Sequence, residues 1–394
     1  MEMTPAPTAG PAAGGASRVR FVHSADWQIG MTRHFLDADA QARFTAARVD
    51  VIARIGEVAR AERCAFVVVG GDVFETNHVE RRVVVRALEA MAAAEVDFYL
   101  LPGNHDPLDA SSVLLSATFR EHAPANVHVL AEPGVHPVAP GVELVAAPWT
   151  TKRPLSDLCA DAVAGLEPDG TVRIVVGHGA VDVLSPDPTE PSLVRLEDAE
   201  SALRAGAVHY VALGDRHSTT SVGATGRIWY SGAPEPTAYD EVDPGQVLVV
   251  DLDGATGAVD VLRRRVGTWR FVRHEAHLDG LEDVESLARW LDRLADKDRT
   301  IVKLSLVGTL SLAAASRLEA VLAHPADLLA ALERWERHTD LAVLPDQADL
   351  DELELGGFAR EALADIRAMA TDGGADERTA RDALGLLFRL GRAS

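Results

Sequence analysis

The chain has 394 residues, 47% of them hydrophobic, which is the composition of a globular protein and excludes an intrinsically disordered one. A chain of this length exceeds what one compact core usually holds, so we expect more than one domain. The formal net charge of −22 argues against strong nucleic-acid binding by the bare chain, because such binding depends on Lys and Arg neutralising phosphates.

The N-terminal stretch Met1–Ser17 consists mainly of Ala, Pro, Gly and Thr. It lacks the apolar run of a signal peptide, so we expect a flexible tail there. No later stretch approaches the roughly 18 apolar residues that a membrane-spanning helix needs, and no membrane association is expected. Cys64 and Cys159 are the only cysteines, which argues against a disulfide framework and favours a reducing, cytoplasmic location.

Short β-branched runs alternate with amphipathic segments from Arg18 to about Leu262. This alternation indicates an α/β layered fold. Towards its end the helices drop out, and we expect Gln246–Asp251 and Val259–Arg263 to close the second sheet of a β-sandwich as a meander. The elements predicted before that point are strands at Val19–Ser24, Ala65–Gly70, Val96–Leu101, Glu143–Ala147, Arg173–Gly177 and Val208–Leu213, and helices at Ala38–Arg60 and Val79–Ala94.

The pattern changes after about Gly267. An amphipathic segment at Leu281–Ala295, an alternating strand at Ile301–Val307 and a helix at Ser311–Leu322 predict a small α/β module. Two apolar-striped helices follow, at Phe358–Ala370 and Glu377–Leu390. The predicted organisation is therefore a tail over residues 1–17, an α/β domain over 18–266, a second module over 267–346 and a helical segment over 347–394.

Residues of the types that bind metal ions follow the predicted strands at five places. Loops at strand ends meet at one edge of an α/β sheet, so these motifs are expected to converge. A single Asp or His at a strand end is more often a turn or cap residue, and the prediction depends on all five together. The motifs are Asp26-Trp27-Gln28, Gly71-Asp72, Gly103-Asn104-His105-Asp106, Gly177-His178 and Gly214-Asp215-Arg216-His217.

Carboxylates, imidazoles and an amide oxygen together suit manganese or iron. A pair of such ions about 3.5–4 Å apart holds a phosphate and generates hydroxide for in-line attack on it. One carboxylate must bridge both ions, and Asp72, directly after a buried strand, fits that position. The glycines before the predicted ligands let the backbone turn sharply beneath the ions. The motifs therefore predict a paired divalent-metal site that acts on phosphate esters.

This set resembles the signature of the calcineurin-like metallophosphoesterase superfamily, whose motifs are DxH, GDxxD/H, GNHD, GH and GHxH. Within that superfamily the chain is similar to the SbcD-type DNA repair exonucleases from about Arg20 to Asp251. The resemblance implies a β-sandwich flanked by helices, followed by a small α/β capping domain and C-terminal helices. It is carried by the runs His23–Trp27, Gly71–Phe74, Leu101–Asp106, Val176–His178 and Ala212–Gly214.

The resemblance also implies roles for the motif residues. His105 would stabilise the pentavalent phosphate or protonate the leaving oxygen. Asp106 would orient His105, the alternative being a helix N-cap or an Asx turn. Mn²⁺ is the expected metal, with Mg²⁺ and iron as alternatives. One ion would be held by Asp26, Gln28, Asp72 and His217, and the other by Asp72, Asn104, His178 and Asp215.

The chain departs from the family pattern at three positions. Gln28 stands where the family usually has His, and Asp215 stands where the first His of GHxH is expected. Asp215 keeps an oxygen ligand and makes its site more anionic, whereas Gln28 is a weaker, neutral ligand. Glu75 takes a position that is usually Asp or His. We therefore expect the fold to be intact and the first metal to be held less tightly.

The function implied is that of a metal-dependent DNA phosphodiesterase, a 3′-to-5′ exonuclease with single-strand endonuclease activity, working in DNA repair with an SbcC or SMC-like coiled-coil ATPase. The C-terminal helices would dock on that ATPase, or alternatively cover their own core. A homodimer is a further expectation from the family. Two other functions stay open: a small-molecule phosphodiesterase, which the acidity favours, and a catalytically weak scaffold subunit, which Gln28 favours.

Overall fold

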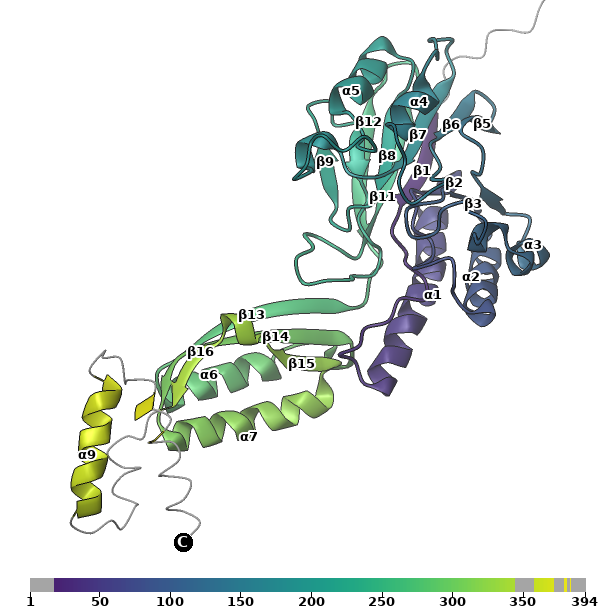
Figure 1. Cartoon of the computed structure of the whole chain (residues 1–394). Coiled ribbons are helices and arrows are strands. Elements are labelled where there is room, and N and C mark those ends of the chain that lie inside the picture. The colour runs from purple at the N-terminus through teal and green to yellow at the C-terminus, as the bar shows by residue number, and fades with distance from the viewer. Residues whose placement is uncertain (1–17, 344–357, 372–378, 381–382, 384–394) are drawn as a thin grey trace, which may run out of the picture. The chain divides into compact units, whose positions relative to one another are not determined.

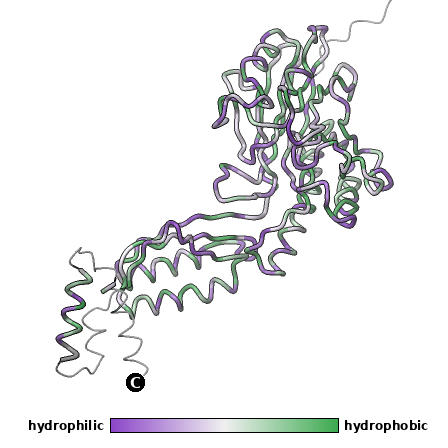
Figure 2. Tube along the Cα trace, in the orientation of Figure 1, coloured by the Kyte–Doolittle hydropathy of each residue, from purple (hydrophilic) through white to green (hydrophobic). Residues whose placement is uncertain are grey.

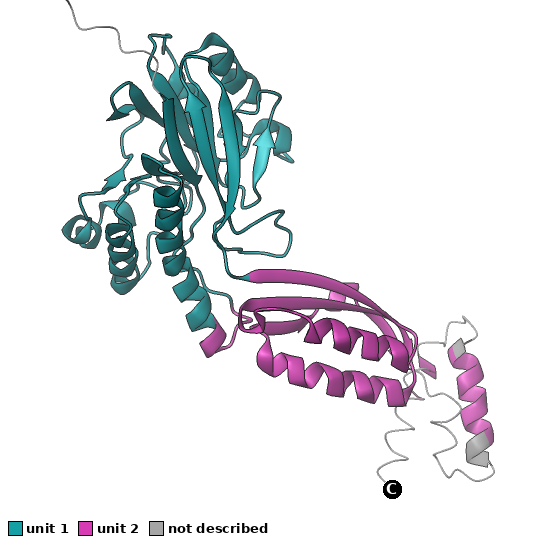
Figure 3. Cartoon of the chain, turned by 180° about the vertical axis from the view of Figure 1, so that it is seen from behind, with its two compact units in different colours: residues 1–33, 41–269 teal, residues 34–40, 270–394 magenta. Residues whose placement is uncertain are grey.

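The computed structural model describes residues 18–343, 358–371, 379–380 and 383. These residues fold as two compact units (Figure 3). Unit 1 is made of residues 18–33 and 41–269, and unit 2 of residues 34–40 together with the described residues from 270 onward. The domain limits expected from the sequence, at 266/267 and 346/347, stay predictions.

The first sheet of unit 1 has six strands in the order β12-β11-β1-β2-β3-β4. β1 to β4 are parallel, and the β11–β12 hairpin joins β1 antiparallel. This placement corrects the expectation that the hairpin closes the second sheet. Val247–Val250 of β11 are buried on both faces, which a strand achieves only inside a covered sheet. The strands are β1 (Arg18–Ser24), β2 (Phe66–Val69), β3 (Asp97–Leu100), β4 (Val127–Val129), β11 (Gln246–Asp253) and β12 (Val259–Arg265).

The second sheet has the order β5-β6-β7-β8-β10-β9. Its four inner strands are parallel, and β5 and β9 pair antiparallel at the two edges. The carboxyl ends of β6, β7 and β8 therefore lie along one rim of the sheet. The strands are β5 (Gly134–Ala139), β6 (Val142–Ala146), β7 (Val172–His178), β8 (Tyr210–Gly214), β9 (Thr220–Val222) and β10 (Ile228–Tyr230).

The two sheets pack face to face, and helices cover their outer faces (Figure 1). Phe21 and Val250 of the first sheet meet Ile174 and Tyr210 of the second in the central core. Buried residues on the two longest covering helices, Ala38–Ala61 and Arg81–Ala93, recur at helical spacing, so each of these turns one apolar face to its sheet. The predicted α/β sandwich is confirmed. The helices are α1 (Ala38–Ala61), α2 (Arg81–Ala93) and α3 (Ala117–His122) on the first sheet, and α4 (Leu158–Val163) and α5 (Leu196–Ala205) on the second.

Unit 2 contains a parallel sheet covered on one face by two helices. Leu287 and Leu318 of those helices pack against Leu304 and Leu306 of the central strand. The strands are β13 (Arg270–Leu278), β14 (Thr300–Leu310), β15 (Ala331–Arg334) and β16 (Asp340–Val343), and the helices are α6 (Leu281–Asp292) and α7 (Leu312–Leu328). Short 3-10 helices of the chain lie at Val113–Leu115, Asp182–Leu184, Lys297–Arg299 and Glu336–His338.

The helix predicted at Phe358–Ala370 corresponds to α9 (Phe358–Thr371), whereas the one predicted at Glu377–Leu390 lies almost entirely outside the described residues. Figure 2 shows hydrophilic and hydrophobic residues interleaved along the helices. Among the described residues, no helix combines the length and the apolar character needed to cross a membrane.

Candidate metal centre

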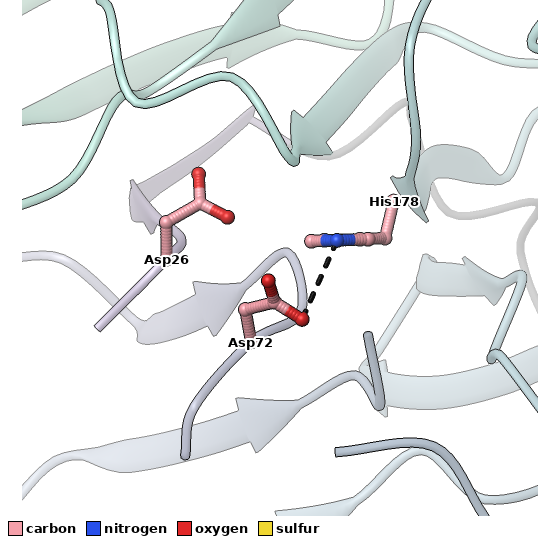
Figure 4. A group of neighbouring side chains, drawn as sticks. All are labelled: Asp26, Asp72 and His178. Atoms are coloured by element: carbon pink, nitrogen blue, oxygen red, sulfur yellow. Dashed lines mark ion pairs between the residues drawn. The ribbon is translucent and has the colours of Figure 1, made fainter. Parts of the chain in front are cut away.

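The predicted motifs follow strands whose carboxyl ends meet where the two sheets face each other. Asp26 follows β1, Asp72 follows β2, and His178 is the last residue of β7. Each offers one ligand-type atom, and these atoms lie within 4.8 Å of one another (Figure 4). All three residues are buried. The structure therefore brings together two carboxylates and an imidazole, although Asp26 and His178 are more than a hundred residues apart in the sequence.

The loops that carry these residues have an unusual backbone conformation. Asp26, Gln28, Asp72 and Asp215 have φ between 45° and 98°, in the left-handed region that residues other than glycine rarely adopt. They make up four of the eight such residues in the described part of the chain. Backbone strain of this kind costs about 1–3 kcal/mol for each residue and is concentrated at functional sites. The strain is consistent with loops shaped to turn side chains inward.

Glycines allow the loops to approach one another closely. A Cβ on Gly103 would overlap the Asp72 carboxylate, and a Cβ on Gly71 would overlap the His178 ring. Gly71 also has a φ of +96°, which favours glycine on its own account. Both glycines belong to the sequence motifs, so the close approach explains why they precede the ligand-type residues.

Acceptor atoms surround the His178 ring. Its Nδ1 donates to the Gly70 carbonyl at 2.8 Å, and its Nε2 lies 3.5 Å from Asp72 Oδ1 and 3.9 Å from Asp215 Oδ1. Burial lowers the pKa of His178, but Asp72, Asp215 and Asp26 outweigh it and raise this pKa to about 9. Positive charge is therefore favoured at Nε2, at the place where a bound cation would contact the ring.

The Asn104 amide has two possible orientations, of which only the second satisfies its hydrogen bonds in the absence of a cation. In one, Oδ1 faces His178 Nε2 at 2.7 Å. In the other, the amide nitrogen donates to Asp72 Oδ2 at 3.2 Å and to His178 Nε2 at 2.7 Å. Only the first turns an oxygen lone pair towards Asp72 and His178, and a cation between these groups would favour it.

Two buried oxygens at the centre have no hydrogen-bond partner among the residues that the structure describes. Asp26 uses Oδ1 to accept from the Asp215 N–H at 2.9 Å, which leaves Oδ2 unpaired, and Gln28 Oε1 is unpaired as well. Burial raises the pKa of Asp26 to about 6, against the opposing effects of His217 and His178. A buried unpaired oxygen costs about 1–3 kcal/mol, which coordination to a cation would relieve. The donor set thus fits divalent metal ions.

His217 lies beside Gln28. Gln28 Nε2 is 3.0 Å from His217 Nε2. His217 Nδ1 faces the opposite way and contacts Thr237 Oγ1 at 2.7 Å and Glu241 Oε1 at 3.1 Å. Neither Thr237 nor Glu241 was expected from the sequence, because both lie outside the motifs and no spacing rule links them to His217.

The neighbours of His105 differ from the prediction. The Asp106 carboxylate accepts from the N–H groups of Gly103 at 2.8 Å and Phe74 at 3.0 Å, and not from the His105 ring; neither the N-cap nor the Asx-turn alternative has this pattern, because both accept from residues later in the chain. His105 Nδ1 instead contacts the Glu75 carbonyl at 2.8 Å. The orienting contact predicted for Asp106 is therefore corrected to the Glu75 backbone, which no side-chain motif reveals. Burial, and then Asp72, raise the pKa of Asp106 to about 7.

Comparison with known proteins agrees with this geometry. Residues 19–218 match the family described as Calcineurin-like phosphoesterase. The match spans half of the chain, so the chain belongs to this family of metallophosphoesterases, as the motifs predicted. The family implies divalent metal ions at the centre.

The individual proteins that resemble the chain have low sequence identity to it. The SbcD component of the SbcCD nuclease of Rhodobacter capsulatus is 28% identical over 335 residues, which cover 71% of this chain and 77% of that protein. Among solved structures, TT1561 of Thermus thermophilus is 8% identical with a TM-score of 0.39, covering 64% of this chain and 100% of that one. A dimetal phosphatase from Danio rerio is 14% identical with a TM-score of 0.36, covering 63% of this chain and 99% of that one.

Proposed function

We propose that this member of the calcineurin-like phosphoesterase family is a metal-dependent DNA phosphodiesterase. It would act as a 3′-to-5′ exonuclease and single-strand endonuclease in DNA repair, together with an SbcC-like coiled-coil ATPase. The observation that carries the phosphodiesterase part is the buried cluster of Asp26, Asp72 and His178. DNA as the substrate and the ATPase as the partner rest on similarity to a component of a nuclease over 71% of the chain.

The ligand sets remain those that the family resemblance implies, with Mn²⁺ as the proposed metal. The unpaired oxygens of Asp26 and Gln28 support the first set, and the acceptors around His178 support the second. Bound divalent ions would supply stabilisation of phosphate charge and a hydroxide nucleophile. One ion is assigned to Asp26, Gln28, Asp72 and His217, and the other to Asp72, Asn104, His178 and Asp215.

The residues around His105 prepare it to act on the phosphate. Its backbone N–H donates to Asp72 Oδ1 at 2.9 Å, which holds the His105 loop against the bridging carboxylate. Its Nδ1 donates to the Glu75 carbonyl, so Nε2 is the nitrogen left for the substrate, and it carries a proton there when the ring is in its imidazolium form. Asp106 holds the loop by joining Gly103 to Phe74.

Cleavage of end-labelled single- and double-stranded DNA by the purified chain, with and without Mn²⁺, tests the proposal. His105→Gln is the matched variant, because the Gln side chain is close to His in size and polarity but has no ionisable nitrogen. We expect manganese-dependent cleavage that the variant loses while it still binds metal. Cleavage of a small phosphodiester such as bis(p-nitrophenyl) phosphate but of no DNA, even with the ATPase present, would overturn the substrate assignment. No cleavage of either would favour a scaffold.

A further inference from the structure

The loop between β10 and β11 carries a buried carboxylate that the family motifs do not include. The side chain of Glu241 is 5% exposed. Its carboxylate accepts from the backbone N–H of Thr237 through both oxygens, at 3.1 and 3.0 Å, and from the Thr237 hydroxyl. It also contacts His217 Nδ1 at 3.1 Å. A buried carboxylate is costly unless it is paired, and here its partners are Thr237 and the ring of a proposed metal ligand.

We propose that Glu241 is a positioning residue that fixes the tautomer and the orientation of His217 and thereby sets the affinity of one metal ion. The inference rests on the proposed function, in which His217 Nε2 is a ligand. An imidazole bonded to a carboxylate at Nδ1 carries its proton there, and its Nε2 becomes a better electron-pair donor. The lone pair of His217 Nε2 is thereby turned towards Gln28, which lies at 3.0 Å.

The loop that presents Glu241 is itself held at several points. Arg33 donates to the Thr237 carbonyl at 2.6 Å, and the buried Arg48 donates to the Pro236 carbonyl at 2.8 Å. The Ala233 N–H donates to the His217 carbonyl at 3.0 Å. The loop is therefore tied both to its own surroundings and to the segment that carries His217. A carboxylate held in this way needs little rearrangement when the ring binds a cation.

The composition of the first ligand set gives Glu241 its importance. Of its proposed members, Asp26, Gln28, Asp72 and His217, only His217 is an imidazole. Gln28 contributes a neutral amide, a weaker donor than the imidazole that the family usually has there. The second set, by contrast, has His178, whose Nδ1 is bonded to the Gly70 carbonyl and not to Glu241. Loss of Glu241 should therefore weaken the binding of one ion and leave the binding of the other unchanged.

The experiment is a calorimetric titration of the metal-free full chain with Mn²⁺, comparing wild type with Glu241→Ala and Glu241→Gln. Outer hydrogen-bond partners of metal-binding histidines typically contribute about 10- to 100-fold in affinity. We expect a loss in that range at one of two sites for Glu241→Ala and a smaller loss for Glu241→Gln, with the other site unchanged. Glu57→Ala, at an exposed position on α1, is the control and should match wild type.

The ¹⁵N chemical shifts of His217 in the metal-free proteins provide a second readout that does not depend on binding. Wild type should show the Nδ1–H form, and Glu241→Gln should show a larger share of the Nε2–H form. If a folded variant bound Mn²⁺ at both sites with wild-type affinity and its ¹⁵N shifts were unchanged, the positioning role alone would be overturned. Equal weakening of both sites would also overturn it, because that is a general structural effect. Absence of Mn²⁺ binding by wild type would instead overturn the proposed function and this inference with it.

Discussion

Asp72 is the side chain on which the proposed centre depends most, because it is assigned to both ions. It lies 3.5 Å from His178 Nε2 and also accepts the backbone N–H of His105 at 2.9 Å. We expect Asp72→Ala to lower the amount of bound Mn²⁺ per chain and to abolish cleavage. Elemental analysis of the purified variant by mass spectrometry measures the metal directly. Unchanged metal content would contradict the bridging assignment, and Asp72→Asn separates loss of charge from loss of bulk.

Gln28 is the residue at which the chain departs most clearly from a strong metal site. Its backbone has a φ of 45°, a conformation that His adopts more readily than most side chains. We expect Gln28→His to tighten Mn²⁺ binding at one site by about tenfold, because an imidazole donates more strongly than an amide oxygen. Calorimetric titration against wild type measures the change. Weaker binding in a folded variant would show that the amide is adapted to this site.

His23 gives the stability of the fold a pH dependence. It is fully buried between Tyr210 and the Leu213 carbonyl, and burial lowers its pKa to about 3, although the bond to Leu213 opposes this. The unfolded chain binds a proton near pH 6.5, so the stabilising contribution is complete above that pH. It falls as the pH drops towards 3, by at most about 1.4 kcal/mol for each pH unit.

Urea denaturation of wild type and His23→Gln between pH 7.5 and pH 4.5 tests this assignment. The wild-type free energy of unfolding should fall more steeply with decreasing pH than that of the variant, which lacks the titrating ring. Parallel curves would mean that carboxylates, and not His23, dominate the acid sensitivity.

At the scale of elements, the close packing of the loops after β2 and β3 is what presents Asp72. A Cβ at Gly103 would overlap the Asp72 carboxylate and its backbone nitrogen, so Gly103→Ala must displace one loop. We expect a lower melting temperature and less bound Mn²⁺. Gly280→Ala is the matched control, because a Cβ there would meet no atom within 4 Å. Equal metal content in the two variants would show that the loop can yield without disturbing the centre.

The central strands were predictable because burial on both faces leaves a continuous apolar run, and the long helix was predictable because its apolar residues recur at helical spacing. The strands expected at Val19–Ser24 and Arg173–Gly177 correspond to β1 and β7, and the helix expected at Ala38–Arg60 corresponds to α1. The sheet to which β11 belongs was not predictable, because pairing with β1 spans more than two hundred residues and leaves no local signal. The short strands β4, β9 and β10 were missed because three residues carry too little periodicity.

The site shows the same division. Asp26, Asp72 and His178 were found because strand-end loops must converge, and the structure places them within 4.8 Å. The hydrogen-bond partners of the other two histidines in the predicted motifs, His105 and His217, were not found from the sequence. His105 is held by a backbone carbonyl, which any residue at position 75 would supply, and His217 is held by Glu241, which is 24 residues further along the chain. The first contact depends on loop conformation and not on residue type, and the second joins two segments whose approach no local pattern reveals.

At the scale of the whole molecule, the net charge of −22 opposes association with DNA, so the proposed activity requires a compensating positive charge. Metal ions at the centre provide it locally. We expect the chain without the proposed ATPase to bind DNA more weakly in EDTA than in Mn²⁺, and to lose the difference as salt rises and screens the charges. Fluorescence anisotropy of a labelled single strand measures this, with His105→Gln used to prevent cleavage. Equal binding in EDTA and Mn²⁺ would mean that DNA contacts a surface away from the metal centre, and the acidic chain would then depend on the proposed ATPase to bind its substrate.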